Sequence, residues 1–172
     1  MNPFKIRDRI IYPNQGLAVI EDIQEETLYG EVFQIYHVRI ISNNTLVLVP
    51  CSNAAEMGIR RPVSEDSVED VFRYLKTSHV DVSLDWKGRY KEHVNLMRSG
   101  TLFDMAAVLK SLYYLSLTKP LSFREKKMLE KAKELLVAEI SEVSDRPLSK
   151  IERRVSETLA LSFKTVKAGV EL

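Results

Sequence analysis

The spacing of apolar residues changes abruptly near Pro62, and this change restricts the chain to two consecutive modules of different secondary structure. Within residues 36–40, apolar side chains occupy every second position, which is the period of a half-buried strand. Within residues 68–75 they recur every three or four positions, which is the period of an amphipathic helix. We therefore expect an α+β protein with a β module at residues 1–62 and an all-α module at residues 63–172.

The β module contains short apolar segments separated by turn residues. Strands are expected at residues 9–12, 17–23, 32–40 and 45–49. Pro13 and Gly16 favour a turn because proline fixes φ and glycine accepts a positive φ. Residues 25–30 are polar and predict a longer turn, whereas residues 42–44 predict a tight one. This pattern predicts a small, strongly bent sheet or partly open barrel, with an edge that another protein could extend by main-chain pairing.

The helical module carries a helix-start signal before each apolar stripe. These signals are Ser64, Asp85, Thr101, Ser122 and Ser149. A glutamate follows both Ser122 and Ser149 three residues later, which is the capping-box spacing. After Asp85, helical spacing predicts an inward stripe of Trp86, Tyr90, Val94 and Met97.

Charge and motif content favour a binding protein over an enzyme. The net charge is only +1, but residues 86–133 hold 11 Lys and Arg against 4 Asp and Glu. No Gly-rich phosphate loop or metalloprotease motif occurs, and Cys51 is the single cysteine. No apolar run approaches the roughly 20 residues that span a bilayer. We expect no catalysis, cofactor, metal, small-molecule substrate or membrane contact, and we expect a cytoplasmic location.

A basic segment surrounds the single tryptophan of the chain. Trp86 precedes Lys87, Arg89, Tyr90 and Lys91, and helical spacing places Arg89 and Tyr90 beside Trp86. A flat ring flanked by cations suits a distorted groove or an unstacked base of a nucleic acid. From the spacing alone, an alternative remains open in which Trp86 closes the edge of a helical core and the cations are its solvated rim.

The order of several short motifs resembles the CarD/CdnL family of bacterial RNA polymerase-binding transcription regulators. The opening Phe4-Lys5-Ile6-Arg7-Asp8 and the segment Ile11-Tyr12-Pro13-x-x-Gly16 are typical of that family. Further matches are Leu48-Val49-Pro50, Gly58-Ile59-Arg60, Trp86-Lys87-Gly88-Arg89-Tyr90-Lys91, Ser99-Gly100, Leu121-Ser122-x-x-Glu125-x-x-Met128-Leu129 and Ala132-x-x-x-Leu136-x-x-Glu139. The resemblance covers about residues 4–143. The N-terminal part is also similar to the polymerase-interacting domain of transcription-repair coupling factor.

The resemblance implies a Tudor-like β module that binds the β subunit of RNA polymerase and a helical module that contacts promoter DNA. By position, Trp86 would wedge into the minor groove at the upstream edge of the transcription bubble. Lys87, Arg89 and Lys91 would contact the DNA backbone, with Tyr90 beside them. Such a regulator stabilises the open promoter complex. We expect it to act as a monomer.

Two positions depart from the family pattern on the polymerase-facing side. Glu26 and Leu48 stand where family members often have arginine, so different pairs are expected there, for example through Arg39 or apolar strand-edge contacts. A protein–protein adaptor without DNA contact, with Trp86 in the core, is the main alternative function. A self-sufficient DNA-binding regulator is a third, but the pI of about 7.8 argues against it.

Overall fold

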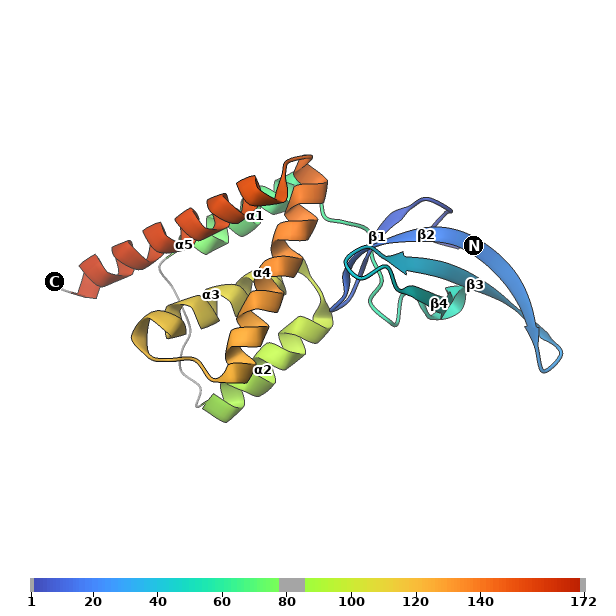
Figure 1. Cartoon of the computed structure of the whole chain (residues 1–172), viewed down its shortest axis with the longest axis horizontal. Helices are drawn as coiled ribbons and strands as arrows, with labels where there is room; N and C mark the ends of the chain where they lie inside the picture. Colours follow the sequence, from blue (N-terminus) through green and yellow to red (C-terminus); the bar gives the residue numbers. More distant parts are fainter. Residues whose placement is uncertain (1, 78–85, 171–172) are drawn as a thin grey trace. The chain divides into compact units, whose positions relative to one another are not determined.

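The computed structural model describes residues 2–77 and 86–170, which divide into two compact units with a boundary after Pro62. Side chains are described through residue 164, except that of Trp86. All strands lie in the first unit and the α-helices lie in the second, as the blue and the green-to-red ribbons of Figure 1 show. This order confirms the α+β fold class, with a bent sheet module followed by a helical one.

The first unit is an antiparallel sheet in which each strand pairs with its neighbour in sequence. The strands are β1 (Arg9–Tyr12), β2 (Gly16–Leu28), β3 (Glu31–Ile40) and β4 (Leu46–Pro50), and the short 3-10 helix η1 (Cys51–Asn53) follows them. Arg60 forms an isolated antiparallel β-bridge with Ile11, on the side of β1 that does not pair with β2. At the opposite side of the sheet, β4 pairs with β3 and forms the other edge.

The hairpin of β2 and β3 is longer than the sequence pattern predicts. Residues 25–28 were expected in a turn but continue β2, because their pairing with β3 extends to Leu28 opposite Glu31. The turn is therefore limited to Tyr29 and Gly30, whose φ angles are 54° and 83°. Positive φ at both central residues gives the twist that two-residue hairpins favour.

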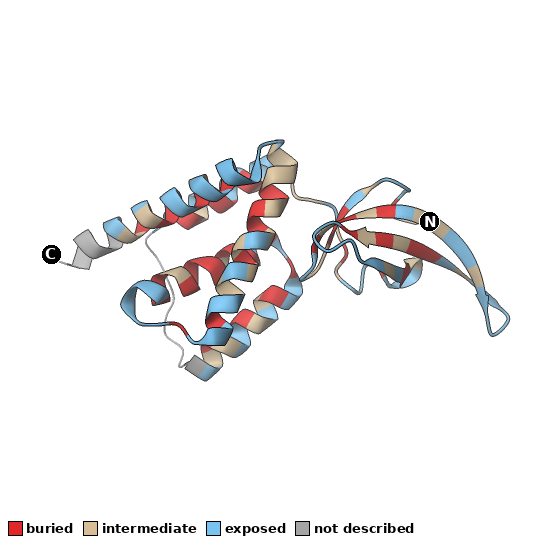
Figure 2. Cartoon of the chain, viewed as in Figure 1, coloured by how far each residue is buried: buried red, intermediate tan, exposed pale blue. Residues whose placement is uncertain are grey.

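Alternate residues of the bent sheet form the core of the first unit. Tyr36 and Val38 on β3 are fully buried, and Val49 on β4 and Ile20 on β2 are buried beside them. Phe4 packs edge-on against Tyr36 with ring centroids 5.9 Å apart. Figure 2 shows buried positions alternating with partly buried ones along parts of the strands. The period of two read from the sequence therefore corresponds to one inward face.

The second unit contains α-helices, some of which follow capping side chains. They are α1 (Glu65–Lys76), α2 (Trp86–Ser99), α3 (Leu102–Thr118), α4 (Phe123–Ser144) and α5 (Leu148–Val170). Ser64 and Thr101 accept hydrogen bonds from backbone N–H groups of α1 and α3. Ser122 and Glu125 form the expected capping box of α4. The second capping box was wrong: α5 begins at Leu148, so Ser149 lies inside its first turn.

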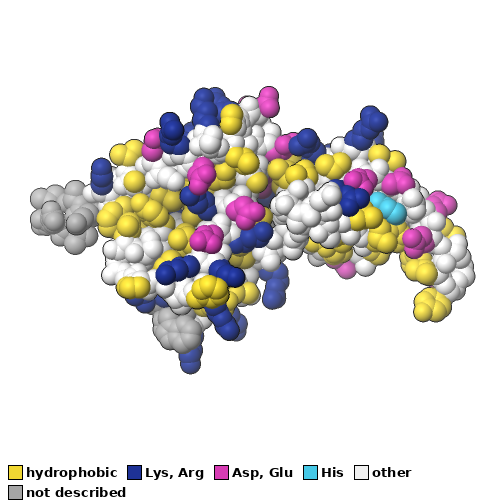
Figure 3. Space-filling model, viewed as in Figure 1, with side chains coloured by type: hydrophobic (Ala, Val, Ile, Leu, Met, Phe, Trp, Pro, Cys, Tyr) yellow, Lys and Arg dark blue, Asp and Glu magenta, His cyan; other side chains and the backbone are white. Residues whose placement is uncertain are grey.

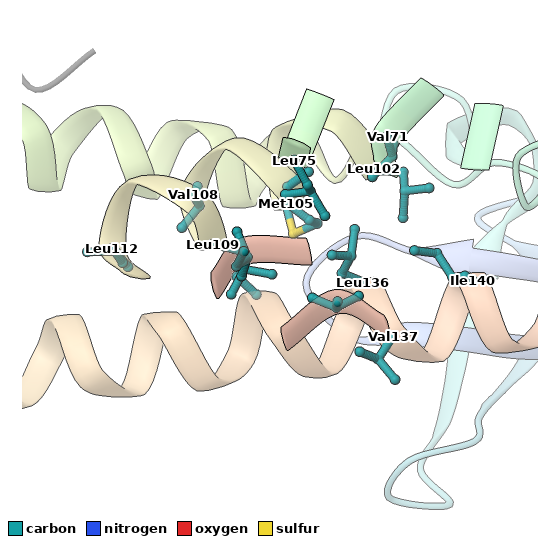
Figure 4. Close-up of a cluster of buried hydrophobic side chains, with 14 of the residues drawn as sticks. Val71, Leu75, Leu102, Met105, Val108, Leu109, Leu112, Leu136, Val137 and Ile140 are labelled. Carbon is teal, nitrogen blue, oxygen red and sulfur yellow. The ribbon is translucent and has the colours of Figure 1, made fainter. Parts of the chain in front are cut away.

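The apolar stripes of α1, α3, α4 and α5 meet in one core. Figure 4 shows Leu109 and Met105 of α3 opposite Leu136 of α4, with Leu75 of α1 beside them. Leu136 is fully buried, whereas Leu129 and Leu135 are partly buried against the same core. The helical period predicted at residues 68–75 marks the side of α1 that enters this core.

A buried lysine holds the end of α1. Lys110 on α3 is 1% exposed, and its ammonium donates to the carbonyl oxygens of Tyr74 and Thr77 at 2.9 and 2.6 Å. Ser162 on α5 also donates to the Thr77 carbonyl, at 2.8 Å. Burial lowers the pKa of Lys110 to about 8. These bonds satisfy carbonyl groups that the helix end leaves without partners.

Candidate functional site

The basic segment of the sequence forms the beginning of α2. Trp86 is the first residue of that helix, but its side chain lies outside the described residues. Lys87 and Lys91 are exposed, and Tyr90 is half-buried. Residues four apart share one side of a helix, so Lys87 and Lys91 project from the same face. These two cations are therefore accessible from solvent, and their contact with DNA stays a prediction.

Arg89 does not belong to that surface. Its side chain is buried, and its Nη2 lies 3.3 Å from Oε1 of Glu125 on α4, which is buried as well. The other carboxylate oxygen of Glu125 accepts a hydrogen bond from the backbone N–H of Ser122 at 3.0 Å. One carboxylate therefore caps α4 and binds α2. The expectation that Arg89 is an exposed backbone contact beside Lys87 is not met, because Glu125 draws its guanidinium inward.

Electrostatics favour the ionised form of this carboxylate. Burial by itself would raise the pKa of Glu125, but hydrogen bonds from Ser122 and the guanidinium of Arg89 outweigh burial and lower that pKa. Glu125 is therefore ionised at neutral pH. A buried charge of one sign requires its partner, so Arg89 and Glu125 hold α2 and α4 in a fixed register.

His93 fixes the next turn of α2 in the same way. Its side chain is 4% exposed, and its Nε2 lies 3.1 Å from Oγ of Ser111 on α3. Burial, with a smaller contribution from the charge of Arg89, lowers the pKa of His93 to about 4. The ring is therefore neutral at pH 7 and serves as a hydrogen-bonded core residue.

The inward stripe of α2 is thus rotated from the predicted one. Arg89, His93 and Met97 are buried, whereas Tyr90 and Val94 are half-buried. The spacing of apolar residues does not reveal this stripe, because two of its members are polar. Arg89 and His93 are buried through partners that lie 36 and 18 residues away in sequence. The spacing of Arg89, His93 and Met97, each four residues after the last, was the available signal.

In the first unit, the sheet register brings the other predicted residues onto one face. Glu26 lies opposite Phe33, Arg39 opposite Leu46, and Leu48 opposite His37. Paired residues project to the same side, and positions 33, 37 and 39 of β3 share one side because the period is two. Glu26, Arg39 and Leu48 therefore lie on the face opposite the core residues Tyr36 and Val38.

Arg39 is held by an acidic neighbour on this outer face. Its Nε and Nη2 donate to the two carboxylate oxygens of Glu21 at 2.9 and 3.0 Å, and Nη1 donates to the Asn44 carbonyl at 3.0 Å. The hydrogen bonds from Arg39 lower the pKa of Glu21. Arg39 is thus a partly exposed cation whose guanidinium is paired on the outer face.

The edge strand β4 presents apolar side chains to solvent. Leu46 and Leu48 are 43% and 51% exposed, and both lie on the outer face. An edge strand also carries unpaired backbone N–H and C=O groups that can pair with a strand of another protein. This edge of the sheet therefore offers both backbone groups that another strand can pair with and two exposed apolar side chains.

Exposed Lys and Arg side chains lie at the beginning of both α2 and α4. On the face shown in Figure 3, Lys and Arg side chains gather over the region where Figure 1 places α2 and the start of α4. Among the described residues, no group of three His, Cys, Asp or Glu side chains could hold a metal ion. Within the same residues, no helix is long and apolar enough to cross a membrane.

Comparisons with known proteins divide the chain in the same way. Residues 4–63 match the family model of the CarD-like/TRCF RID domain, and residues 70–156 match that of the CarD C-terminal domain. A curated relative from Bacillus subtilis (strain 168), named "Putative transcription factor YdeB", is 31% identical over 137 residues. That match covers 80% of this chain and 90% of the relative.

Proposed function

Because this chain belongs to the CarD-like family of transcription factors, we propose that it binds RNA polymerase and promoter DNA together and stabilises the open promoter complex. The first unit binds the β subunit of the polymerase, and the second unit contacts DNA at the upstream edge of the bubble. The chain acts in the cytoplasm as a monomer, without a cofactor. The match of both family models, in order and over most of the chain, carries this proposal.

The edge strand β4 supports the polymerase contact. A partner strand can pair with its backbone, while Leu46 and Leu48 supply apolar contact beside it. Arg39 and Glu26 lie on the same face and can contribute polar contacts at the rim. Leu48 stands where family members often have arginine, so an apolar contact replaces a charged one at this position.

The beginning of α2 supports the DNA contact. Lys87 and Lys91 are exposed on one face of the helix and can bind phosphates, and Tyr90 adjoins them. Trp86 immediately precedes this pair and is the proposed wedge. An inserted ring has to offset an unstacking cost of a few kcal/mol per base step, so it acts where DNA is already distorted. Arg89 contributes by positioning α2 through Glu125.

The polymerase contact can be tested by co-purification with the full-length chain. A tagged wild-type protein should retain purified RNA polymerase, and Leu48→Lys should lose most of it, because a desolvated charge would replace an apolar contact at the edge strand. Leu161→Lys is the matched control, since Leu161 is 62% exposed on α5 of the other unit. Retention of polymerase by Leu48→Lys would reject the β4 contact. A wild-type chain that retains no polymerase would favour the adaptor function.

A further inference from the structure

We propose that the corner between α3 and α4 is a second DNA contact, in which Phe123 stacks on an unpaired base and Lys119, Arg124 and Lys127 bind the flanking phosphates. This inference rests on the proposed function and extends the DNA contact from α2 to a different helix. It concerns single-stranded DNA, whereas Lys87 and Lys91 face a duplex backbone.

The phenyl ring of Phe123 is unusually accessible. Phe123 is the first residue of α4 and is 71% exposed, and among the described large apolar residues only Tyr29 is more exposed. It belongs to neither buried core. The ammonium of Lys127, one turn later, lies 4.8 Å from the ring centroid. A cation therefore covers one face of the ring, and most of the rest remains accessible to a base.

Further cations lie close to Phe123 in the sequence. Lys119, Arg124, Lys126 and Lys127 are all exposed, and none of the first three forms an ion pair within the part of the chain whose side chains are described. Residues 119–131 contain five Lys or Arg and two acidic residues, and one of these two, Glu125, is buried against Arg89. The corner therefore carries a net positive charge that suits phosphate groups.

The corner is fixed in place relative to α2. Glu125 lies two residues after Phe123 and forms both the capping box with Ser122 and the ion pair with Arg89. The first turn of α4 is thus ordered and packed beside the turn of α2 that follows Trp86. A rigid aromatic side chain loses little conformational freedom on binding, so this arrangement suits a stacking contact.

The residue types at this corner indicate a ligand of relaxed sequence specificity. Residues 119–131 contain no Asn or Gln, the side chains that read adenine edges in duplex DNA, and Ser122 is occupied in the helix cap. An aromatic ring with neighbouring cations is the combination that binds single strands through stacking and backbone charge. The unpaired strand beside a duplex junction is therefore the expected ligand.

The test measures binding of the full-length chain, at low salt, to a fluorescent DNA duplex with a single-stranded overhang and to the same duplex without it. Phe123→Ala should lower affinity for the overhang probe about five- to a hundredfold and leave duplex affinity and melting temperature unchanged. Phe123→Trp should retain binding. Phe103→Ala is the matched control, since Phe103 is 44% exposed on α3 beside Tyr74.

Trp86→Ala separates this inference from the proposed function. Loss of overhang binding by Phe123→Ala, with or without an effect of Trp86→Ala, supports the corner contact. If Trp86→Ala loses overhang binding and Phe123→Ala does not, the corner contact is overturned and the proposed function stands. An equal loss for both probes in Phe123→Ala would overturn the stacking role. A wild-type chain that binds neither probe would overturn the corner contact and the proposed DNA contact together.

Discussion

The guanidinium of Arg89 on α2 lies 3.3 Å from the carboxylate of Glu125 on α4, and both side chains are about nine-tenths buried. Removing one partner leaves an uncompensated buried charge, so Arg89→Ala should reduce the free energy of unfolding by about 3–5 kcal/mol. Lys87→Ala, an exposed position on the same helix, should change it by about 0.5 kcal/mol or less. Chemical denaturation of the two variants checks this prediction.

A double-mutant cycle tests whether loss of the ion pair between Arg89 and Glu125 causes this drop in stability. Replacing both residues together, as Arg89→Met with Glu125→Leu, should cost less than the sum of the single changes, because neither charge then remains buried alone. Strict additivity of the two single effects would contradict the ion pair.

Acid should destabilise the second unit through His93. Its pKa is about 4 in the folded protein and near 6.5 in the unfolded chain, so the unfolded state binds more protons between these values. Stability is therefore complete above about pH 6.5, falls as the pH decreases toward 4, and loses up to about 3 kcal/mol over this window. Denaturation curves recorded between pH 7 and pH 4 measure the slope.

His93→Gln provides the matched control for this slope. Glutamine can keep a hydrogen bond to Ser111 but does not titrate, so the variant should lose the part of the pH dependence that falls between pH 6.5 and pH 4. If wild type and variant show the same slope in this window, His93 is not the titrating group.

The helical core should be sensitive to cavities at Leu136. This side chain extends from α4 and is fully buried in the helical core, so Leu136→Ala should cost about 2–5 kcal/mol of stability. Leu161→Ala, at a side chain that is 62% exposed, should be nearly neutral. Thermal melting compares the two, and an unchanged melting temperature for Leu136→Ala would refute the core assignment.

Salt dependence should separate the cations of α2 by role. Lys87→Ala and Lys91→Ala should each flatten the dependence of DNA affinity on salt by about one unit, because one phosphate contact is lost. Arg89→Gln removes a charge but should leave the salt slope unchanged, since the guanidinium of Arg89 pairs with Glu125 and not with a phosphate. Binding titrations at several salt concentrations measure the slopes. A slope that changes for Arg89→Gln but not for Lys87→Ala would reverse this assignment.

The sequence predicted the elements that depend on local chemistry. The alternation at Tyr36 and Val38, the helical period at residues 68–75, and the caps at Thr101 and Ser122 all follow from rules that act within a few residues. The same local rules failed at residues 25–28, where pairing with β3 overrides polar composition and extends the strand.

The candidate site was predictable in its exposed part only. Lys87 and Lys91 are exposed, but their contact with DNA stays a prediction. The burial of Arg89 and of Lys110 could not be predicted, because each depends on a partner about 36 residues away in the chain. Polar residues of this kind become core residues only when tertiary packing supplies their partners.

The lifetime of promoter complexes shows directly whether the chain stabilises the open complex. RNA polymerase bound to a promoter fragment is challenged with a competitor, with and without the full-length chain, and the surviving open complexes are counted over time. The wild-type chain should lengthen the lifetime, and Trp86→Ala should remove most of this effect while the protein keeps its melting temperature. A wild-type chain that leaves the lifetime unchanged, or a Trp86→Ala variant that lengthens it as the wild type does, would contradict the account.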